Sequence, residues 1–218
     1  MIGALLLSAT VIGSGILAAR LAGGNNAVAL LANTLATAAM LFVLINAFGP
    51  ISGAHFNPAV SLVMALRRQL TIADAIRYVI AQIIGCIAGA ILAHAMFALP
   101  LIQTGMTVRA GAPLMLSEGV ATFALVFAIL AVARARPVAV PAAVALVIAA
   151  GYWWTPSTSF ANPAITIARA LSDTFAGIRP VDAPGFIGAQ LIGALAAAGV
   201  ARWLPPSCDQ TETALRME

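Results

Sequence analysis

The sequence alternates between long apolar stretches and short polar breaks. A helix needs about 20 predominantly apolar residues to cross the hydrocarbon core of a bilayer, and six stretches meet this requirement. They cover residues 2–21, 27–48, 72–98, 115–133, 138–155 and 184–204. The breaks between them are rich in glycine, proline, asparagine and arginine. This pattern predicts six transmembrane helices.

Two shorter apolar segments run from Pro58 to about Leu66 and from Pro163 to about Leu171. At about 1.5 Å per residue, a helix of this length reaches roughly 14 Å, which is about half of the hydrocarbon core. Neither segment is long enough to cross. We therefore predict two re-entrant half-helices that enter the membrane and stop near its midplane.

Each half-helix begins at the same tripeptide, Asn57-Pro58-Ala59 in the first and Asn162-Pro163-Ala164 in the second. Asparagine is a preferred N-cap, and proline fits the first helical position. The asparagine oxygen is then expected to cap its own helix, which leaves the amide NH2 free to donate. Non-helical backbone at this depth occurs only against protein or a water-filled path. Two such helix starts therefore predict a polar passage between them.

The two halves of the chain repeat each other. The Asn-Pro-Ala tripeptide recurs after 105 residues, and Ala81-Gln82-Ile83-Ile84-Gly85 recurs after 108 residues as Ala189-Gln190-Leu191-Ile192-Gly193. Because three spans per half is an odd number, the second half must insert upside down, which makes an inverted repeat with its solute path at the repeat interface. The predicted fold class is an all-α membrane protein with six transmembrane helices and two re-entrant half-helices. A single transmembrane channel domain is expected over residues 1–204, with halves at about 1–98 and 112–204, followed by a polar tail at 205–218.

Composition excludes an ordinary soluble domain. Hydrophobic residues make up 62% of the 218 residues and charged residues 8%, whereas soluble proteins are about a quarter charged. The basic residues are eleven arginines without lysine. Basic patches with interleaved aromatics are absent from the sequence, so no nucleic-acid partner is expected. Cys86 and Cys208 show no metal-ligand spacing, and no metal or other cofactor is predicted.

The placement of the arginines indicates an orientation, since Lys and Arg are enriched on the cytoplasmic side of membrane proteins. If both termini are cytoplasmic, seven arginines lie inside, namely Arg67, Arg68, Arg77, Arg134, Arg136, Arg202 and Arg216. Four lie outside, namely Arg20, Arg109, Arg169 and Arg179. The sequence therefore predicts a multi-pass protein of the inner (plasma) membrane with both termini in the cytoplasm.

Two Asn-Pro-Ala copies in register with a six-span inverted repeat resemble the aquaporin superfamily, the major intrinsic proteins. The segment Ile51-Ser52-Gly53-Ala54-His55-Phe56-Asn57-Pro58-Ala59-Val60 is similar to the first loop of that family almost residue for residue. The resemblance covers essentially the whole chain. It implies a passive channel for small uncharged solutes in the lipid bilayer, usually a homotetramer with one pore per subunit. It also implies that Asn57 and Asn162 donate to the permeating oxygen; the alternative is that each serves only as an N-cap.

The resemblance also places the outer filter of the pore. Counting without gaps gives Thr37, Ala150, Ser159 and Ile165, and a one-residue shift near Pro156 replaces Ala150 with Gly151. Ile165 stands where the family normally has an arginine. The filter is therefore expected to be wider than that of a water pore and to admit glycerol-like polyols and neutral metalloid hydroxides such as arsenite. The segments Asn162–Arg169 and Ser172–Gly177 are similar to a bacterial aquaglyceroporin branch associated with arsenic resistance.

Arg169 follows Ile165 by four residues and so lies on nearly the same helix face, about one turn further out. Two interpretations stay open. Arg169 either replaces the missing filter arginine as a displaced cation, or it extends to the headgroups or pairs with Asp173.

Glu118 and His55 have two interpretations each. In the family, a glutamate at the position of Glu118 accepts hydrogen bonds from the backbone of the re-entrant loop; the alternative is a proton relay. Its counterpart in the first repeat is expected to fall just before Met1. His55 either donates a hydrogen bond in the inner vestibule or supports its own loop.

Three classes of function are compatible with such a chain. A passive channel is favoured, with a water-selective pore as the alternative within that class. A secondary transporter is also built from inverted repeats, but it needs ionisable groups at depth for coupling, and only Glu118 qualifies. A membrane enzyme is disfavoured because the sequence shows no nucleophile–base pair, metal cluster or phosphate loop.

Overall fold

The structure is a computed structural model that describes residues 1–203, and the tail predicted for residues 205–218 lies outside this range. Its long helices are α1 (Ile2–Leu21), α2 (Asn26–Ser52), α4 (Ile72–Met96), α5 (Ala112–Ala135), α6 (Val140–Trp154) and α8 (Ala183–Val200). Two short helices, α3 (Pro58–Leu66) and α7 (Pro163–Ala170), are the half-helices. Single 3₁₀ turns, η1 (Pro137–Ala139) and η2 (Ala201–Trp203), extend α6 and α8.

The prediction of six spans is confirmed, since six helices of the described residues are long and apolar enough to cross a membrane. Their ends differ from the predicted ends by a few residues. Helix α2 continues through Gly49 and Pro50 instead of ending at residue 48. It ends at Gly53, whose left-handed φ of 69° suits a residue without Cβ.

Large apolar side chains cover the outside of the helices. Exposed examples on the spans are Leu17, Leu35, Ile76, Ile80, Leu116, Leu146 and Ile192. In water such a surface would be unfavourable, whereas lipid tails are as apolar as these side chains. The chain is therefore a multi-pass integral membrane protein.

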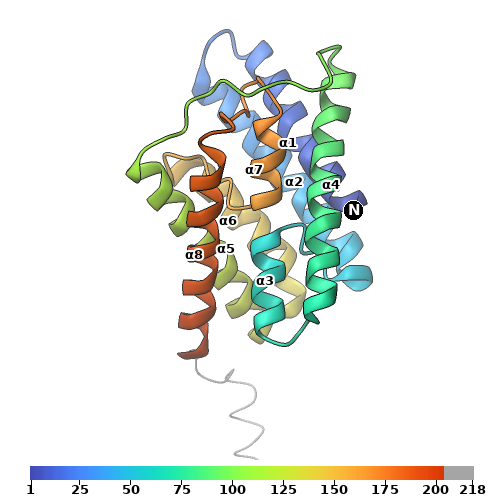
Figure 1. Ribbon diagram of the computed structural model, residues 1–218, viewed down its shortest axis with the longest axis vertical. Coiled ribbons are helices and arrows are strands. Elements are labelled where there is room, and N and C mark those ends of the chain that lie inside the picture. The colour runs from blue at the N-terminus through green and yellow to red at the C-terminus, as the bar shows by residue number, and fades with distance from the viewer. Residues whose placement is uncertain (204–218) are drawn as a thin grey trace, which may run out of the picture.

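The helix contacts repeat between the two halves. Helix α1 packs against α2 and α4, and α5 packs in the same way against α6 and α8. The halves meet where α2 packs against α6. The half-helices α3 and α7 contact each other, and each also contacts both α4 and α8. In Figure 1, α7 accordingly lies above α3, between α8 and α4.

The chain that joins the two halves, residues 97–111, has no helix and crosses one end of the molecule, at the top of Figure 1. We call it the strap, and we call that end of the molecule the strap side. The loop from α7 to α8, residues 171–182, lies beneath it and is called the return loop.

Glycines allow the closest helix contacts in each half. A Cβ added at Gly193 on α8 would collide with the backbone oxygen of Gly119 on α5, and one added at Gly89 on α4 would collide with the backbone oxygen of Leu5 on α1. Backbone atoms cannot move aside as a flexible side chain can. These two helix pairs therefore depend on small residues at their contact, as is common between membrane helices.

Gly193→Ala is expected to lower the thermal stability of the protein in detergent, because overpacking a close contact typically costs about 1–3 kcal/mol. Gly199→Ala on the same helix is the matched control, since a Cβ there meets nothing within 4 Å. The control should unfold at or slightly above the wild-type temperature, because alanine is the better helix former. Equal melting temperatures for the two variants would contradict the close-contact explanation.

Candidate functional site

The two half-helices begin with the same cap. The Asn57 side-chain oxygen accepts from Ala59 N at 2.9 Å, and the Asn162 oxygen accepts from Ala164 N at 3.0 Å. Both asparagines have extended backbone, and each is followed by proline in the first turn. The sequence produces this geometry locally, because asparagine fixes the helix start and proline needs no N–H partner there.

The amide nitrogens of the same two asparagines tie the halves together. Asn57 Nδ2 donates to Ala161 O at 2.7 Å, and Asn162 Nδ2 donates to Phe56 O at 2.8 Å. The N-termini of α3 and α7, which carry the positive ends of the helix dipoles, therefore meet. An amide NH2 has two hydrogens. One of them is used for this cross-connection, so each asparagine keeps one donor rather than the whole NH2 that the sequence suggested.

The backbone before each asparagine has the same unusual conformation. Residues three and one positions before it have left-handed φ angles, 49° and 47° at Ala54 and Phe56, and 49° and 45° at Ser159 and Ala161. Residues with a Cβ rarely adopt this conformation, so both loops are strained in the same places. This matched strain brings the Phe56 and Ala161 carbonyls to the asparagines that they accept from.

Glu118 on α5 holds the loop that precedes Asn162. Its two carboxylate oxygens accept from Phe160 N at 2.8 Å and Ala161 N at 2.9 Å. Gln190 on α8 also donates to the carboxylate at 2.6 Å. The side chain is fully buried, and all three partners are donors, as an ionised carboxylate requires.

The loop that precedes Asn57 is held differently. Ser61 Oγ accepts from Gln82 Nε2 at 2.9 Å and lies 3.1 Å from His55 Nδ1. The His55 ring also packs at 5.3 Å from the ring of Tyr78. Ser61 and Gln82 occupy the repeat positions of Thr166 and Gln190, which are hydrogen-bonded in the same way at 2.9 Å. Both loops are thus supported by an equivalent hydrogen bond from a glutamine to a hydroxyl. The buried carboxylate of Glu118 is an additional support for the loop that precedes Asn162.

A cavity of about 240 Å³ runs along the half-helices and is lined by both Asn57 and Asn162. Its opposite wall includes a stripe of α6 at four-residue spacing, namely Val140, Val144, Ile148 and Tyr152. Twelve residues of helix correspond to roughly 18 Å. The cavity is therefore long and narrow, with an apolar wall on one side and polar groups of the re-entrant loops on the other.

Sequence comparison decides the family of this chain. The family described as Major intrinsic protein matches residues 1–153, which is more than half of the chain and includes the first Asn-Pro-Ala. The chain belongs to the major intrinsic protein family. It is thus a membrane channel rather than an enzyme.

A comparison with one relative extends the match into the second half of the chain. Aquaglyceroporin AqpS of Rhizobium meliloti (strain 1021) is 56% identical over 203 residues, which cover 93% of this chain and 87% of that protein. Aquaporin-4 of Mus musculus is 31% identical over 172 residues, covering 70% of this chain and 51% of its own length. Glycerol uptake facilitator protein-like 6 of Lactiplantibacillus plantarum is 63% identical over 41 residues, or 19% of each chain.

In this major intrinsic protein, three of the predicted filter residues line the cavity, namely Thr37, Ser159 and Ile165. Ala150 does not, and the prediction for it needs correction. The cavity-facing stripe of α6 includes residues 148 and 152, so residue 150 lies about 200° around the helix and is exposed. Gly151 is buried against Ser159, since an added Cβ would lie 2.5 Å from Ser159 Oγ.

Tyr152 takes the place on α6 that counting assigned to Ala150 or Gly151. It is buried, lines the cavity, and donates from its hydroxyl to Thr37 Oγ1 at 3.4 Å. The helical spacing from Val144 and Ile148 was the signal that could have identified it. We use the term mouth for the strap-side end of the cavity, lined by Thr37, Tyr152, Ser159, Ile165 and Arg169.

Arg169 is buried in the wall of the mouth, with 4% of its surface exposed. Its Nε donates to Ala176 O, and its guanidinium lies over the ring of Phe160, 3.2 Å from the centroid. Asp173 makes other contacts, because its carboxylate accepts from Met106 N at 3.1 Å. Among the described residues, Arg169 has no carboxylate partner within ion-pair distance. The pair with Asp173 is therefore not formed, and the role of Arg169 as a displaced filter cation stays a prediction.

Proposed function

We propose that this channel conducts glycerol-like polyols, neutral metalloid hydroxides such as arsenite, and water through a mouth that lacks an arginine at residue 165. The observation that carries the proposal is Ile165 itself, which lines the cavity at the position after the second Asn-Pro-Ala. Isoleucine offers no hydrogen bond and no charge. The permeating molecule therefore meets an apolar wall on this side.

The mouth also has polar groups. It carries the hydroxyls of Thr37, Tyr152 and Ser159. A polyol has a carbon face and a hydroxyl edge, and the combination of Ile165 with three hydroxyls complements both. A metalloid trihydroxide presents a similar edge of hydroxyls. The names of two relatives, an aquaglyceroporin and a glycerol uptake facilitator-like protein, support the same class of solute.

Further along the cavity, the amide groups of Asn57 and Asn162 donate hydrogen bonds to the solute. Glu118 and His55 support the loops that carry these two asparagines. Each asparagine has one amide hydrogen that is not used in the cross-connection. The dipoles of α3 and α7 add positive potential at the same point. A neutral oxygen can accept from these donors, whereas a cation is repelled.

Arg169 acts as the displaced filter cation in this proposal. At an effective dielectric constant of about 20, a unit positive charge disfavours a cation about 4 Å away by about 4 kcal/mol, and the repulsion falls with distance. This barrier is large enough to exclude cations while neutral solutes pass. It permits a wide mouth without a leak of ions.

We further infer that the strap side faces the exterior of the inner (plasma) membrane and that the channel is a homotetramer. Of the described arginines, six lie near the opposite end, namely Arg67, Arg68, Arg77, Arg134, Arg136 and Arg202, against Arg20, Arg109, Arg169 and Arg179 on the strap side. This distribution supports a cytoplasmic side opposite the strap, with both termini inside. The extensive exposed apolar surface suits contacts with both lipid and neighbouring subunits.

Stopped-flow measurements on proteoliposomes test the proposed solutes. We expect permeability to water, glycerol and arsenite to exceed that of protein-free liposomes by at least about tenfold, without any dependence on ion gradients. Urea serves as a small planar comparison solute. Swelling in response to water alone would favour a water-selective pore, and uptake that requires an ion gradient would favour a transporter; either result contradicts the proposal.

A further inference from the structure

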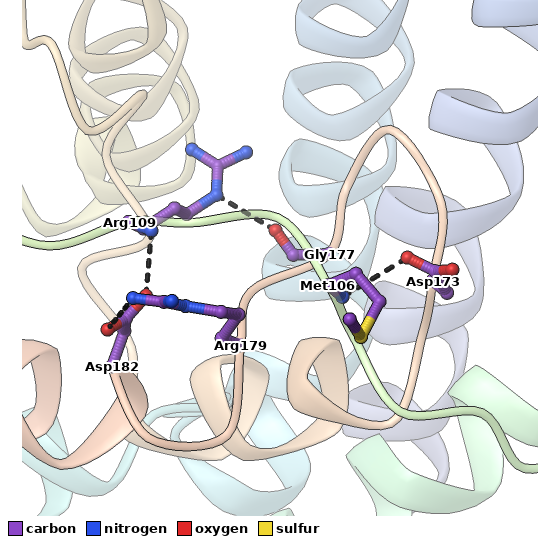
Figure 2. Close-up of polar contacts among 6 residues, drawn as sticks. All are labelled: Met106, Arg109, Asp173, Gly177, Arg179 and Asp182. Atoms are coloured by element: carbon purple, nitrogen blue, oxygen red, sulfur yellow. Dashed lines mark hydrogen bonds and ion pairs between the residues drawn. The ribbon is translucent and has the colours of Figure 1, made fainter.

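The strap is fastened to the return loop along most of its length. Backbone hydrogen bonds join Gln103 N to Leu171 O, Gly105 N to Ala170 O and Arg179 N to Thr107 O, at 2.9–3.2 Å. Side chains add two more, Met106 N to Asp173 Oδ1 at 3.1 Å and Asp173 N to Gln103 Oε1 at 2.9 Å. These hydrogen bonds hold the strap against the return loop; Figure 2 shows the one between Met106 and Asp173.

Arg109 is the strap residue that contacts Phe160, which lines the cavity next to the mouth residue Ser159. Its Nε donates to Gly177 O at 2.8 Å and its Nη1 donates to Ser157 O at 3.3 Å. Its guanidinium carbon lies 4.9 Å from the centroid of the Phe160 ring. One side chain thus connects the strap to the return loop and to the loop that precedes Asn162.

The backbone of Arg109 is itself anchored. Its N–H donates to Asp182 Oδ2 at 2.8 Å, and Asp182 also forms an ion pair with Arg179 at 3.0 Å, as Figure 2 shows. The hydrogen bond from Arg179 lowers the pKa of the Asp182 carboxyl, so the anchor stays ionised through the neutral range. The Arg109 side chain therefore reaches Phe160 and Gly177 from a fixed backbone position.

Arg109 and Arg169 share their surroundings. Both guanidinium groups contact the Phe160 ring, and their Nε atoms donate to the adjacent carbonyls of Gly177 and Ala176. Within the described residues, neither guanidinium is within ion-pair distance of a carboxylate. Phe160 and the segment Ala176–Gly177 thus fix the position of Arg169, and Arg109 in turn holds both of them.

We propose that Arg109 is a positioning residue for the filter: it fixes Phe160 and the Ala176–Gly177 carbonyls, and thereby holds Arg169 in the wall of the mouth. This inference rests on the proposed role of Arg169 as the cation barrier. Without Arg109, the buried carbonyls of Gly177 and Ser157 lose their donors, and the Phe160 ring loses one cationic contact. Arg169 is then no longer held beside the path, so the barrier to cations falls. The strap thus contributes to the exclusion of cations, in addition to joining the two repeats.

A double-mutant cycle on the full chain in proteoliposomes tests the proposal. The variants are Arg109→Gln, Arg169→Gln and the double variant, and the readouts are potassium leak and the ratio of glycerol to water permeability. We expect Arg169→Gln to raise the leak at least about tenfold and Arg109→Gln to raise it several-fold. The double variant should leak no more than about twice as much as Arg169→Gln alone, because Arg109 acts through Arg169. Additive effects would overturn the proposal.

Arg109→Lys separates position from charge, and it also replaces Arg109→Gln if that variant does not fold. Lysine keeps the charge but lacks the fixed geometry of the guanidinium, so its leak should resemble that of Arg109→Gln. A wild-type leak in Arg109→Lys would overturn the positioning role.

Arg20→Gln is the matched control. Arg20 also lies on the strap side and contacts a phenylalanine ring, Phe97, at 5.1 Å, away from the cavity lining. Its leak should stay at the wild-type level, and an Arg109→Gln variant that matches this control would overturn the inference. A wild-type leak in Arg169→Gln would instead contradict the proposed barrier itself, so the two failures are distinguishable.

Discussion

Glu118→Ala is expected to remove both the stability and the permeability of the channel. The substitution removes the acceptor of three buried N–H groups: those of Phe160 and Ala161, and one amide N–H of Gln190, whose Nε2 keeps its hydrogen bond to Thr166 Oγ1. Each unsatisfied buried donor costs about 1–3 kcal/mol, and two of them lie in a loop whose backbone is already strained. The loop should leave its position beside the cavity. Thermal unfolding in detergent and glycerol flux in proteoliposomes measure the two effects.

Glu118→Gln and Ser117→Ala complete this experiment. Glutamine retains one acceptor but turns an NH2 group toward existing donors, so its melting temperature should fall between those of the wild type and Glu118→Ala. Ser117 is the neighbouring buried residue and donates only within its own helix, to Leu114 O at 2.8 Å. Its alanine variant should behave almost as wild type. A Glu118→Ala protein as stable and permeable as Ser117→Ala would show that the carboxylate does not hold the loop.

The sequence was sufficient for features that depend on local rules. Apolar runs of sufficient length gave the six spans, and Asn-Pro-Ala gave the starts of both half-helices at Pro58 and Pro163, because capping and proline geometry act over a few residues. The repeat offsets also placed Gln82 and Gln190 at equivalent positions, and the structure gives them equivalent hydrogen bonds to Ser61 and Thr166.

The rotation of a helix about its own axis and the conformation of a loop could not be predicted from the sequence in the same way. The face that α6 turns to the cavity depends on its contacts with α2 and α5, so counting back from Asn162 reached Ala150 rather than Tyr152. The loop between α6 and α7 contains three residues with left-handed φ angles, namely Thr158, Ser159 and Ala161. Residues with a Cβ rarely adopt this conformation, so the sequence gives no indication of it.

Arg109 was missed for a different reason. It lies in a strap without helical or strand periodicity, and its contacts are to residues 48 to 73 positions away in the chain. From the sequence, Arg109 was only one of the four arginines assigned to the outer side of the membrane. Its relation to Arg169 follows from the tertiary structure, in which the strap and the return loop meet at Phe160.

Asn57→Ser and Asn162→Ser are expected to lower glycerol permeability by at least about tenfold while the protein still folds. Serine is as good an N-cap as asparagine, so α3 and α7 keep their starts. The shorter side chain lacks the amide, and so it removes both the cross-connection to the opposite loop and the second amide hydrogen, which we propose donates to the solute. The substitution therefore separates capping from conduction, the two roles that the sequence left open for these residues.

Asn33→Ser provides the matched control for a buried amide. Asn33 lies on α2 outside the cavity lining and donates to Val11 O and Ser14 Oγ, both at 2.8 Å. Its loss should lower thermal stability but leave the permeability of each folded channel unchanged. Full glycerol flux in both Asn57→Ser and Asn162→Ser would mean that the two asparagines only cap their helices. The paired half-helices would then be a structural support beside the path, and selectivity would have to reside in the mouth alone.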